Sequence, residues 1–173
     1  RPDQVRLFFS EALEELSAIN PDNYQLDAEL EIVDLQLEAP LYNSVLIQFL
    51  DPIEALTIYE LTLSNAISDC LGNPIGANNQ ARFALAQDIE PFDIVLNEIL
   101  YDPETGGSRF VEIYNRSDKV IDAFDLILAK RNELGDIGFL SPISEPSLLF
   151  PDQYLVLTPS PEDIQSRYFA ENP

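Results

Sequence analysis

The chain has 173 residues, of which 31 are acidic and nine are basic, so its formal net charge is −22. A surface this acidic repels phosphate, and we therefore expect neither nucleic acid nor anionic lipid head groups as partners. The chain has no histidine and a single cysteine, which excludes Ser-His-Asp and Cys-His catalysis, histidine-ligated zinc and an internal disulfide. No apolar run is long enough to cross a membrane. Because position 1 is not methionine, we expect a processed product or a fragment, with any export signal upstream.

Short β-prone runs separated by turn formers fill the first half of the chain, which is typical of a β-sandwich. The clearest strand covers residues 56–64, where Tyr59, Leu61 and Leu63 point to one side. Tyr59 stands where the tyrosine corner of immunoglobulin-like sandwiches belongs, with its hydroxyl bonded to upstream backbone. The other expected strands cover residues 5–9, 24–26, 30–37 (with a bulge), 45–50 and 82–85.

One short helix is expected within this half. It covers residues 11–18, with Ser10 as its N-cap and acidic residues in its first turn. Leu13 and Leu16 share a face of this helix. The sequence therefore predicts a helix that packs one apolar side against the sandwich.

The stretch SDCLGNPI, residues 68–75, is expected to be a long turn. Asp69 and Asn73 are interpreted as turn formers whose side chains bond their own backbone. No cation or base lies near Cys70 in the sequence, so we expect a small residue packed against the sheet and not a reactive thiol. The alternative is that Cys70 pairs with a cysteine outside this sequence.

Four segments of the first half follow a shared pattern. They are Phe9–Ser10–Glu11, Asn23–Tyr24–Gln25–Leu26, Tyr59–Glu60–Leu61–Thr62–Leu63 and Asp69–Cys70–Leu71–Gly72–Asn73–Pro74. With these segments, residues 5–85 resemble the bacterial Ig-like modules of surface and S-layer proteins. The resemblance implies an immunoglobulin-like sandwich that serves as a spacer or presenter in secreted, multi-domain proteins.

A short segment, residues 88–92, is interpreted as a linker between a first domain, residues 1–87, and a second domain, residues 93–173. Pro91 stiffens this segment. We therefore expect limited freedom between the two domains.

The second domain opens with two β-prone runs, residues 93–101 and 109–115, joined by the sequence DPETGGS. Pro103 presets a turn, and Gly106–Gly107 tolerates positive φ. The two runs are therefore expected to form a hairpin with a longer loop.

Downstream of a turn at residues 115–119, the apolar residues of 120–130 recur almost every second position, which predicts one continuous strand. Its expected core residues are Ile121, Phe124, Leu126 and Leu128, and its expected solvent residues are Asp122, Asp125, Lys130 and Arg131. The remaining expected elements are a loop over 132–151 with one short strand at 137–140, a strand over 154–158, and a helix over 161–169 capped by Ser160.

This half carries a second resemblance. The residues that carry it are Asn97–Glu98–Ile99–Leu100, Asp102–Pro103, Gly106–Gly107, Phe110–Val111–Glu112–Ile113–Tyr114–Asn115, Ser117 and Asp125–Leu126–Ile127–Leu128. They are similar to the lamin tail domain as it occurs in secreted proteins of Bacteroidetes-type bacteria. The resemblance implies an immunoglobulin-like sandwich without catalysis, because the residues that the family shares are core and turn residues. It also implies further strands, so we expect a truncated second domain whose open sheet edge forms a homodimer or a strand swap.

Four acids around the hairpin loop are the candidate metal ligands: Glu98, Asp102, Glu104 and Glu112. Carboxylates near a turn suit Ca²⁺, which takes several oxygen ligands. The D-x-D-x-D-G spacing of a calcium loop is absent, and the alternative is that Glu98 and Glu112 are solvent-facing strand residues. No other cofactor is expected.

Three further patterns have structural alternatives. Two carboxylates at a set separation are used by glycosidases, but among 31 acids some pair always looks suitable. Asn115–Arg116–Ser117 matches the N-glycosylation pattern and is interpreted as a turn. Five tyrosines, Tyr24, Tyr42, Tyr101, Tyr114 and Tyr154, form either a platform for stacking sugars or ordinary packing.

The sequence therefore predicts an all-β chain of two tandem immunoglobulin-like sandwiches, the second of them truncated. The expected function is that of a non-catalytic, secreted or cell-surface interaction or scaffold module of a larger bacterial protein. The alternatives are a Ca²⁺-dependent carbohydrate-binding module and an accessory domain of a secreted hydrolase. Other domains of the same polypeptide, and proteins or glycans at the cell surface, are the expected partners.

Overall fold

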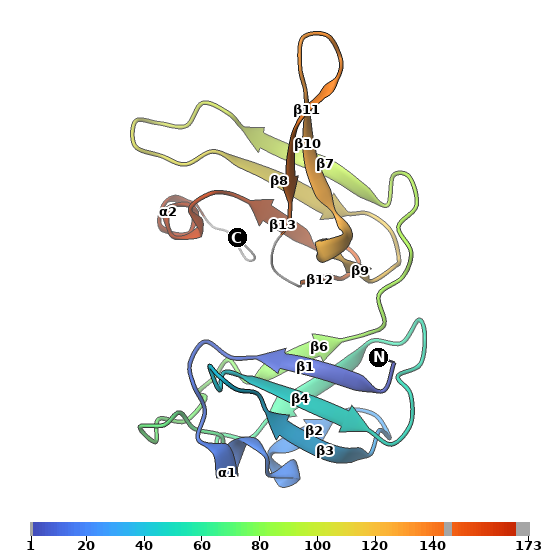
Figure 1. Cartoon of the computed structure of the whole chain (residues 1–173), viewed down its shortest axis with the longest axis vertical. Coiled ribbons are helices and arrows are strands. Elements are labelled where there is room, and N and C mark those ends of the chain that lie inside the picture. Colours follow the sequence, from blue (N-terminus) through green and yellow to red (C-terminus); the bar gives the residue numbers. More distant parts are fainter. Residues whose placement is uncertain (1, 144–146, 169–173) are drawn as a thin grey trace. The chain divides into compact units, whose positions relative to one another are not determined.

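The computed structural model describes residues 2–143 and 147–168. The chain is all-β, as predicted, and its strands form small antiparallel sheets (Figure 1). It divides into two compact units, Arg1–Leu85 and Ala86–Pro173. Within the described ranges, no helix is long and apolar enough to span a membrane.

The first unit contains two three-stranded antiparallel sheets, with the strand orders β1-β4-β3 and β2-β5-β6. The strands are β1 (Gln4–Phe8), β2 (Tyr24–Leu26), β3 (Ile32–Leu37), β4 (Ser44–Phe49), β5 (Tyr59–Leu63) and β6 (Gln80–Phe83). Between β1 and β2 lie the helix α1 (Glu15–Ala18) and a short 3₁₀ helix, Pro21–Asn23. The bulge expected in β3 is present, because its register with β4 shifts between Ile32 and Asp34.

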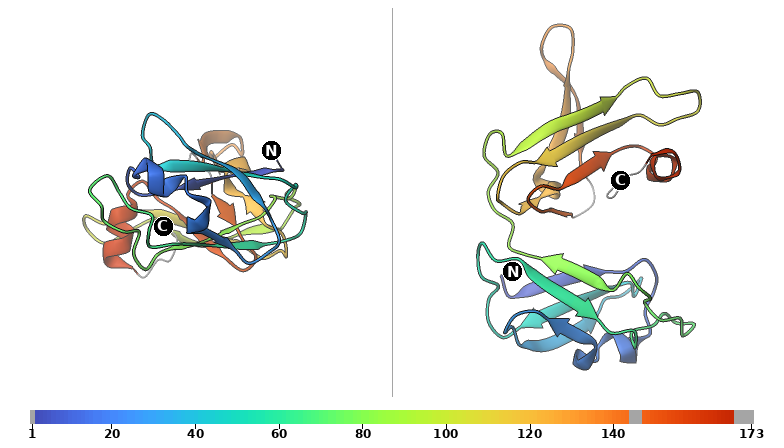
Figure 2. Two further views of the ribbon diagram at one scale, coloured as in Figure 1. Left: turned by 90° about the horizontal axis from the view of Figure 1, so that it is seen from below. Right: turned by 180° about the vertical axis from the view of Figure 1, so that it is seen from behind.

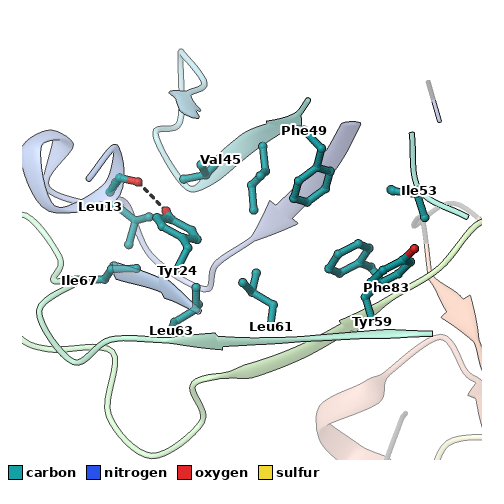
Figure 3. Packing of buried hydrophobic residues seen from close by; sticks show 12 residues of the cluster. Leu13, Tyr24, Val45, Phe49, Ile53, Tyr59, Leu61, Leu63, Ile67 and Phe83 are labelled. Carbon is teal, nitrogen blue, oxygen red and sulfur yellow. Dashed lines mark hydrogen bonds between the residues drawn. The ribbon is translucent and has the colours of Figure 1, made fainter. Parts of the chain in front are cut away.

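Alternate residues of the central strands β4 and β5 form the core of the first unit (Figure 3). Tyr59, Leu61 and Leu63 of β5 are buried, which confirms the predicted alternation. They point toward Val45 and Phe49 of β4, which are also buried. The two sheets therefore enclose one apolar layer, and burial of such side chains stabilises the unit by about 1.5–3 kcal/mol each.

The Tyr59 hydroxyl makes the upstream backbone contact that its position in the sequence predicts. It accepts a hydrogen bond of 3.1 Å from the backbone N–H of Glu54. The Tyr59 ring stacks on Phe83 of the neighbouring strand, with ring centroids 5.2 Å apart. Tyr59 therefore holds the turn before β5 against the strand itself.

The predicted helix over residues 11–18 is wrong in its start and in its cap. The helix begins only at Glu15, and Glu14 caps it in place of Ser10. The Glu14 carboxylate accepts hydrogen bonds from the backbone N–H groups of Leu16 (3.0 Å) and Ser17 (2.7 Å). These are N–H groups that a helix end leaves without a partner, so a single carboxylate fixes where the helix starts.

The two leucines expected to share a helix face are separated by this later start. Leu13 lies before the helix, where its backbone N–H donates to the Tyr42 carbonyl (2.8 Å) and its side chain is buried. Leu16 lies in the helix and is 76% exposed. Long-range backbone bonds to the sandwich therefore override the helical propensity of residues 11–14.

The second unit contains a three-stranded antiparallel sheet of order β13-β8-β7 and two strand pairs, β10-β11 and β12-β9. The strands are β7 (Ile94–Leu100), β8 (Phe110–Asn115), β9 (Ile121–Asp122), β10 (Ile127–Arg131), β11 (Ile137–Pro142), β12 (Leu148–Leu149) and β13 (Tyr154–Leu157). The β7–β8 hairpin and strand β13 confirm the predictions for these segments.

The continuous strand predicted over residues 120–130 is wrong. The chain forms β9, then a 3₁₀ turn, Ala123–Asp125, and then β10. The Asp122 side chain accepts a hydrogen bond of 2.9 Å from the Phe124 backbone N–H, which favours the turn over an extended strand. Phe124, expected in the core, is exposed as a result.

The long loop predicted over residues 132–151 is also wrong in part. The short strand expected at 137–140 is present as β11, but it pairs with β10 and so makes a hairpin of most of this loop. Strand β12 was not predicted, and it pairs with β9. Residues 144–146 of the expected loop lie outside the described residues.

The predicted C-terminal helix is present as α2 (Pro161–Arg167), and residue 169 of the prediction lies outside the described residues. Ser160 is the N-cap residue, as predicted, although its side chain makes no capping hydrogen bond. Asp163 of the first turn instead accepts hydrogen bonds from the Ser108 backbone N–H (2.6 Å) and from Arg167 (2.6 Å). The helix is therefore tied to the loop before β8.

The segment interpreted as a linker, residues 88–92, is bonded to the second unit. The Lys119 ammonium donates to the Asp93 carboxylate (2.9 Å) and to the Asp88 carbonyl (3.2 Å), and it pairs with Glu90 (3.1 Å). Its hydrogen bond with Asp93 is the largest of the effects that raise the Lys119 pKa. This part of the chain is therefore the first ordered segment of the second unit.

Candidate interaction surface

Strand β7 is an outer strand of its sheet and pairs with β8 on one side only. Its other side makes no backbone hydrogen bond with any segment that the structure describes. Four successive residues in the middle of β7, residues 96–99, are exposed, and they include Leu96 (59%) and Ile99 (54%). An outer strand with exposed apolar side chains is a template for pairing with another chain.

A second exposed element is the hairpin of β10, β11 and their connecting turn, residues 127–142, which we call the arm. Figures 1 and 2 show it extending beyond the three-stranded sheet of its unit. Residues 129–140 are all exposed. The large apolar side chains exposed on the arm are Ile127 (58%), Leu134 (87%), Ile137 (58%), Phe139 (60%) and Leu140 (58%). An isolated two-stranded hairpin has marginal stability in water, so an arm of this composition gains from being covered.

The strand register places apolar side chains on both faces of the arm. Ala129 lies opposite Leu140 on one face, and Lys130 lies opposite Phe139 on the other. The arm therefore has no single polar face that could be left to solvent, which distinguishes it from a hairpin that packs one side on a core.

The arm also carries two of the nine basic residues of the chain, Lys130 and Arg131. Neither forms an ion pair with a residue in the described part of the chain. Arg131 donates a hydrogen bond of 2.6 Å to the Gly135 carbonyl in the turn of the arm. With Glu133 and Asp136 in the same segment, the arm has no net charge, in contrast to the strongly acidic chain around it.

The four candidate metal ligands are only partly brought together. Glu98 and Glu112 are register partners on β7 and β8, and Asn97 donates a hydrogen bond of 2.6 Å to Glu112. Asp102 and Glu104 lie in the exposed loop between these strands. Among the residues described, no group of three or more acidic, histidine or cysteine side chains is placed to hold a metal ion.

The candidate tyrosines are dispersed, apart from one pair. Tyr114 on β8 and Tyr154 on β13 are register partners with ring centroids 4.6 Å apart. The Tyr114 hydroxyl donates to Asp152 (2.5 Å), and this hydrogen bond raises the Tyr114 pKa. Tyr24 is buried in the first unit, and its hydroxyl bonds to the Ala18 carbonyl (Figure 3).

Asn115 is a polar residue whose structural role the sequence did not reveal. It is fully buried at the end of β8. Its amide donates to the carbonyls of Lys119 (2.8 Å) and Leu149 (3.0 Å), and its Oδ1 accepts from the N–H (3.1 Å) and the hydroxyl (2.7 Å) of Ser117. The N-glycosylation pattern is thus part of a turn, as interpreted, and its amide nitrogen has no free hydrogen.

The turn at residues 68–75 has the backbone bonds expected of the Asp69 side chain, whereas the Asn73 side chain bonds the Asp69 carboxylate and not the backbone. The Asp69 carboxylate accepts hydrogen bonds from the backbone N–H groups of Leu71 and Asn73, both 2.8 Å, and from the Asn73 side chain. The hydrogen bonds from Asn73 lower the Asp69 pKa most. Cys70 is exposed, so its predicted packing against the sheet is wrong, although its Sγ lies 3.5 Å from the Leu13 carbonyl.

Comparison with known proteins adds no relative. No family model matches the chain, and neither a curated protein nor a solved structure matches it.

Proposed function

We propose that this chain is a non-catalytic interaction or scaffold segment of a larger secreted or surface-anchored bacterial protein, built from two immunoglobulin-like sandwiches. The observation that carries the proposal is the exposed apolar surface of the second unit, on β7 and the arm. Monomeric proteins seldom leave such groups of apolar side chains in water unless they bind a partner. The tyrosine contact of Tyr59 supports the immunoglobulin-like reading of the first unit.

The hydrogen-bonded acids of the chain also support a non-catalytic function, because the bonds that they make stabilise local structure. Asp69 fixes a turn, Asp93 holds the start of the second unit through Lys119, and Asp163 ties α2 to a loop. Their side chains make bonds that stabilise local structure, and this role accounts for the lowered pKa values of all three.

A matched pair of leucines tests whether the arm is a surface or part of a core. Leu140 of the arm is 58% exposed, and Leu149 of β12 is buried in the same unit. We expect Leu140→Ala to change the free energy of unfolding by less than about 0.5 kcal/mol. We expect Leu149→Ala to lower it by about 2–5 kcal/mol. Both values are measured by urea denaturation at low protein concentration. Equal losses of unfolding free energy in the two variants would show that the arm belongs to a core and would refute the proposal.

The second candidate function is a Ca²⁺-dependent carbohydrate-binding module, alone or as an accessory to a hydrolase. The neighbouring rings of Tyr114 and the half-exposed Tyr154 favour it, because exposed aromatic rings stack on sugars. Thermal melts with excess Ca²⁺ and with chelator test the metal dependence. A ligand at a hundred times its Kd raises stability by about 2.7 kcal/mol, so coincident curves contradict a calcium-dependent module.

A further inference from the structure

We propose that the partner of the arm is the β7 edge of a second copy of this chain, in a reciprocal two-fold dimer. This inference rests on the proposed function of the arm and β7 as interaction surfaces. It names the occupant of both surfaces at once, since each copy carries one arm and one β7 edge.

The two surfaces match in type. Among the residues that the structure describes, the outer side of the seven-residue strand β7 has no backbone partner, and the five-residue strand β10 pairs with β11 alone. Addition of a strand to an open edge uses backbone hydrogen bonds for affinity and side chains for specificity. Exposed Leu96 and Ile99 on β7 would then meet apolar side chains of the arm, and both sets would leave water.

Charge selects the arm over the simplest alternative, in which two β7 edges pair with each other. Glu98 is exposed in the middle of β7, with Glu112 as its register partner on β8. Pairing of two such edges brings like charges together, which is a device that natural edge strands use against self-association. The arm instead presents Lys130 and Arg131, which have no ion-pair partner among the described residues.

The net charge of the arm also suits a second copy. Residues 127–142 are neutral overall, while the chain as a whole carries −22. The arm can therefore approach an acidic copy without adding like charge at the contact. A reciprocal arrangement satisfies both arms and both edges and closes the assembly, whereas a one-way contact would continue into a filament.

Sedimentation equilibrium of the whole chain, from low micromolar to near-millimolar concentration, tests the proposal. The monomer mass is 19.5 kDa, and we expect a reversible transition to twice that mass. Lys130→Glu with Arg131→Glu, and separately Glu98→Lys, should each weaken the dimer about tenfold, and their combination should recover most of the loss. Arg109→Glu with Arg116→Glu, on exposed arginines of the same unit, is the control with the same change of charge as the arm variant.

Each other outcome overturns the proposal in a recognisable way. Association that the arm variant leaves unchanged, and that Glu98→Gln strengthens by removing the like charges, would mean that β7 pairs with β7. Open-ended growth would exclude the reciprocal arrangement. A monomer at all concentrations would refute the second copy as partner, and the proposed interaction function would still stand if Leu140→Ala is neutral. Thermal melts of each variant at low concentration confirm that the monomers are folded.

Discussion

The buried amide of Asn115 offers the most direct test of how the second unit is held together. Its side chain is 0% exposed and uses all of its hydrogen-bonding capacity, with two donated and two accepted bonds. The donated bonds join the end of β8 to the carbonyls of Lys119 and Leu149, which lie 30 residues apart in the sequence. Replacement of this one side chain should therefore loosen both the turn after β8 and the β12 segment.

The size of the expected loss of stability follows from the hydrogen bonds that the variant lacks. Each hydrogen bond contributes about 0.5–1.5 kcal/mol net, and a buried carbonyl left without a donor costs about 1–3 kcal/mol. Because Asn115→Ala removes the donor of both carbonyls, we expect it to lower the free energy of unfolding of the second unit by about 2–4 kcal/mol. Such a loss is a large fraction of the stability of a small domain.

Asn115→Asp separates hydrogen bonding from packing, because it keeps the shape of the side chain. An ionised carboxylate accepts the two bonds from Ser117 but cannot donate to the two carbonyls. Burial, and the position of the second oxygen against the Lys119 and Leu149 carbonyls, raise the folded pKa of the new carboxyl above its unfolded value of about 3.9. Its protonated form is therefore favoured in the folded state, and the stability of the variant relative to the wild type should fall as pH rises above about 4.

Urea denaturation followed by tyrosine fluorescence and far-ultraviolet circular dichroism gives the free energies. Asn97→Ala is the control, since Asn97 is exposed and its amide makes one bond, to Glu112. We expect the control to change stability by less than about 0.5 kcal/mol. If Asn115→Ala behaved like the control, the bonds to Lys119 and Leu149 would not hold the unit and the reasoning above would be refuted.

Three further substitutions test other parts of the fold. Tyr59→Phe removes the bond to the turn before β5 and should lower the unfolding free energy of the first unit by about 0.5–1.5 kcal/mol in urea titrations. Leu61→Ala opens a cavity between the sheets and should lower it by about 2–5 kcal/mol in the same assay. Hydrogen bonds from the Glu90 N–H and then from Lys119 hold the Asp93 pKa below its usual value, so its contribution is complete above the unfolded pKa and is lost as pH falls through the folded pKa. Asp93→Asn should therefore flatten the acid side of a stability-against-pH curve.

Sequence patterns predicted best those strands whose alternating apolar side chains are covered by another sheet. Tyr59, Leu61 and Leu63 are buried as expected, because a period of two on a central strand places them all between two sheets. The same period failed over residues 120–130. There the side chain of Asp122 bonds the backbone two residues on and bends the chain.

The start of α1 shows why local propensity is a weak guide at element ends. Ser10 is a good cap by residue type, but the backbone of Leu13 is bonded to Tyr42, a residue distant in sequence. The helix therefore starts later, at the first position where a carboxylate, that of Glu14, can take its place as cap. The start of the helix could have been predicted only with knowledge of this tertiary contact.

The arm was missed for a different reason, although the sequence contains a signal for its turn. Asn132 accepts hydrogen bonds from the N–H groups of Leu134 (3.0 Å) and Asp136 (2.9 Å), and Gly135 adopts a φ of +86°. An asparagine followed by glycine at this spacing is typical of a tight connection. What the pattern could not show is whether the apolar residues beside it are covered, because alternation indicates which residues share a face and not what lies against it.

The charge of the chain and the apolar arm lead to one further prediction, on salt dependence. Two bodies of net charge −22 repel each other at long range, and the screening length falls from about 30 Å at 0.01 M salt to about 8 Å at 0.15 M. The contacts proposed for the arm are short-range and largely apolar, so salt screens them much less.

The dimer should therefore strengthen as the salt concentration rises from about 0.01 M to about 0.15 M. Sedimentation equilibrium at the two concentrations measures this directly. Weakening over the same range would mean that Lys130 and Arg131 dominate the association and that the apolar side chains of the arm contribute little to it.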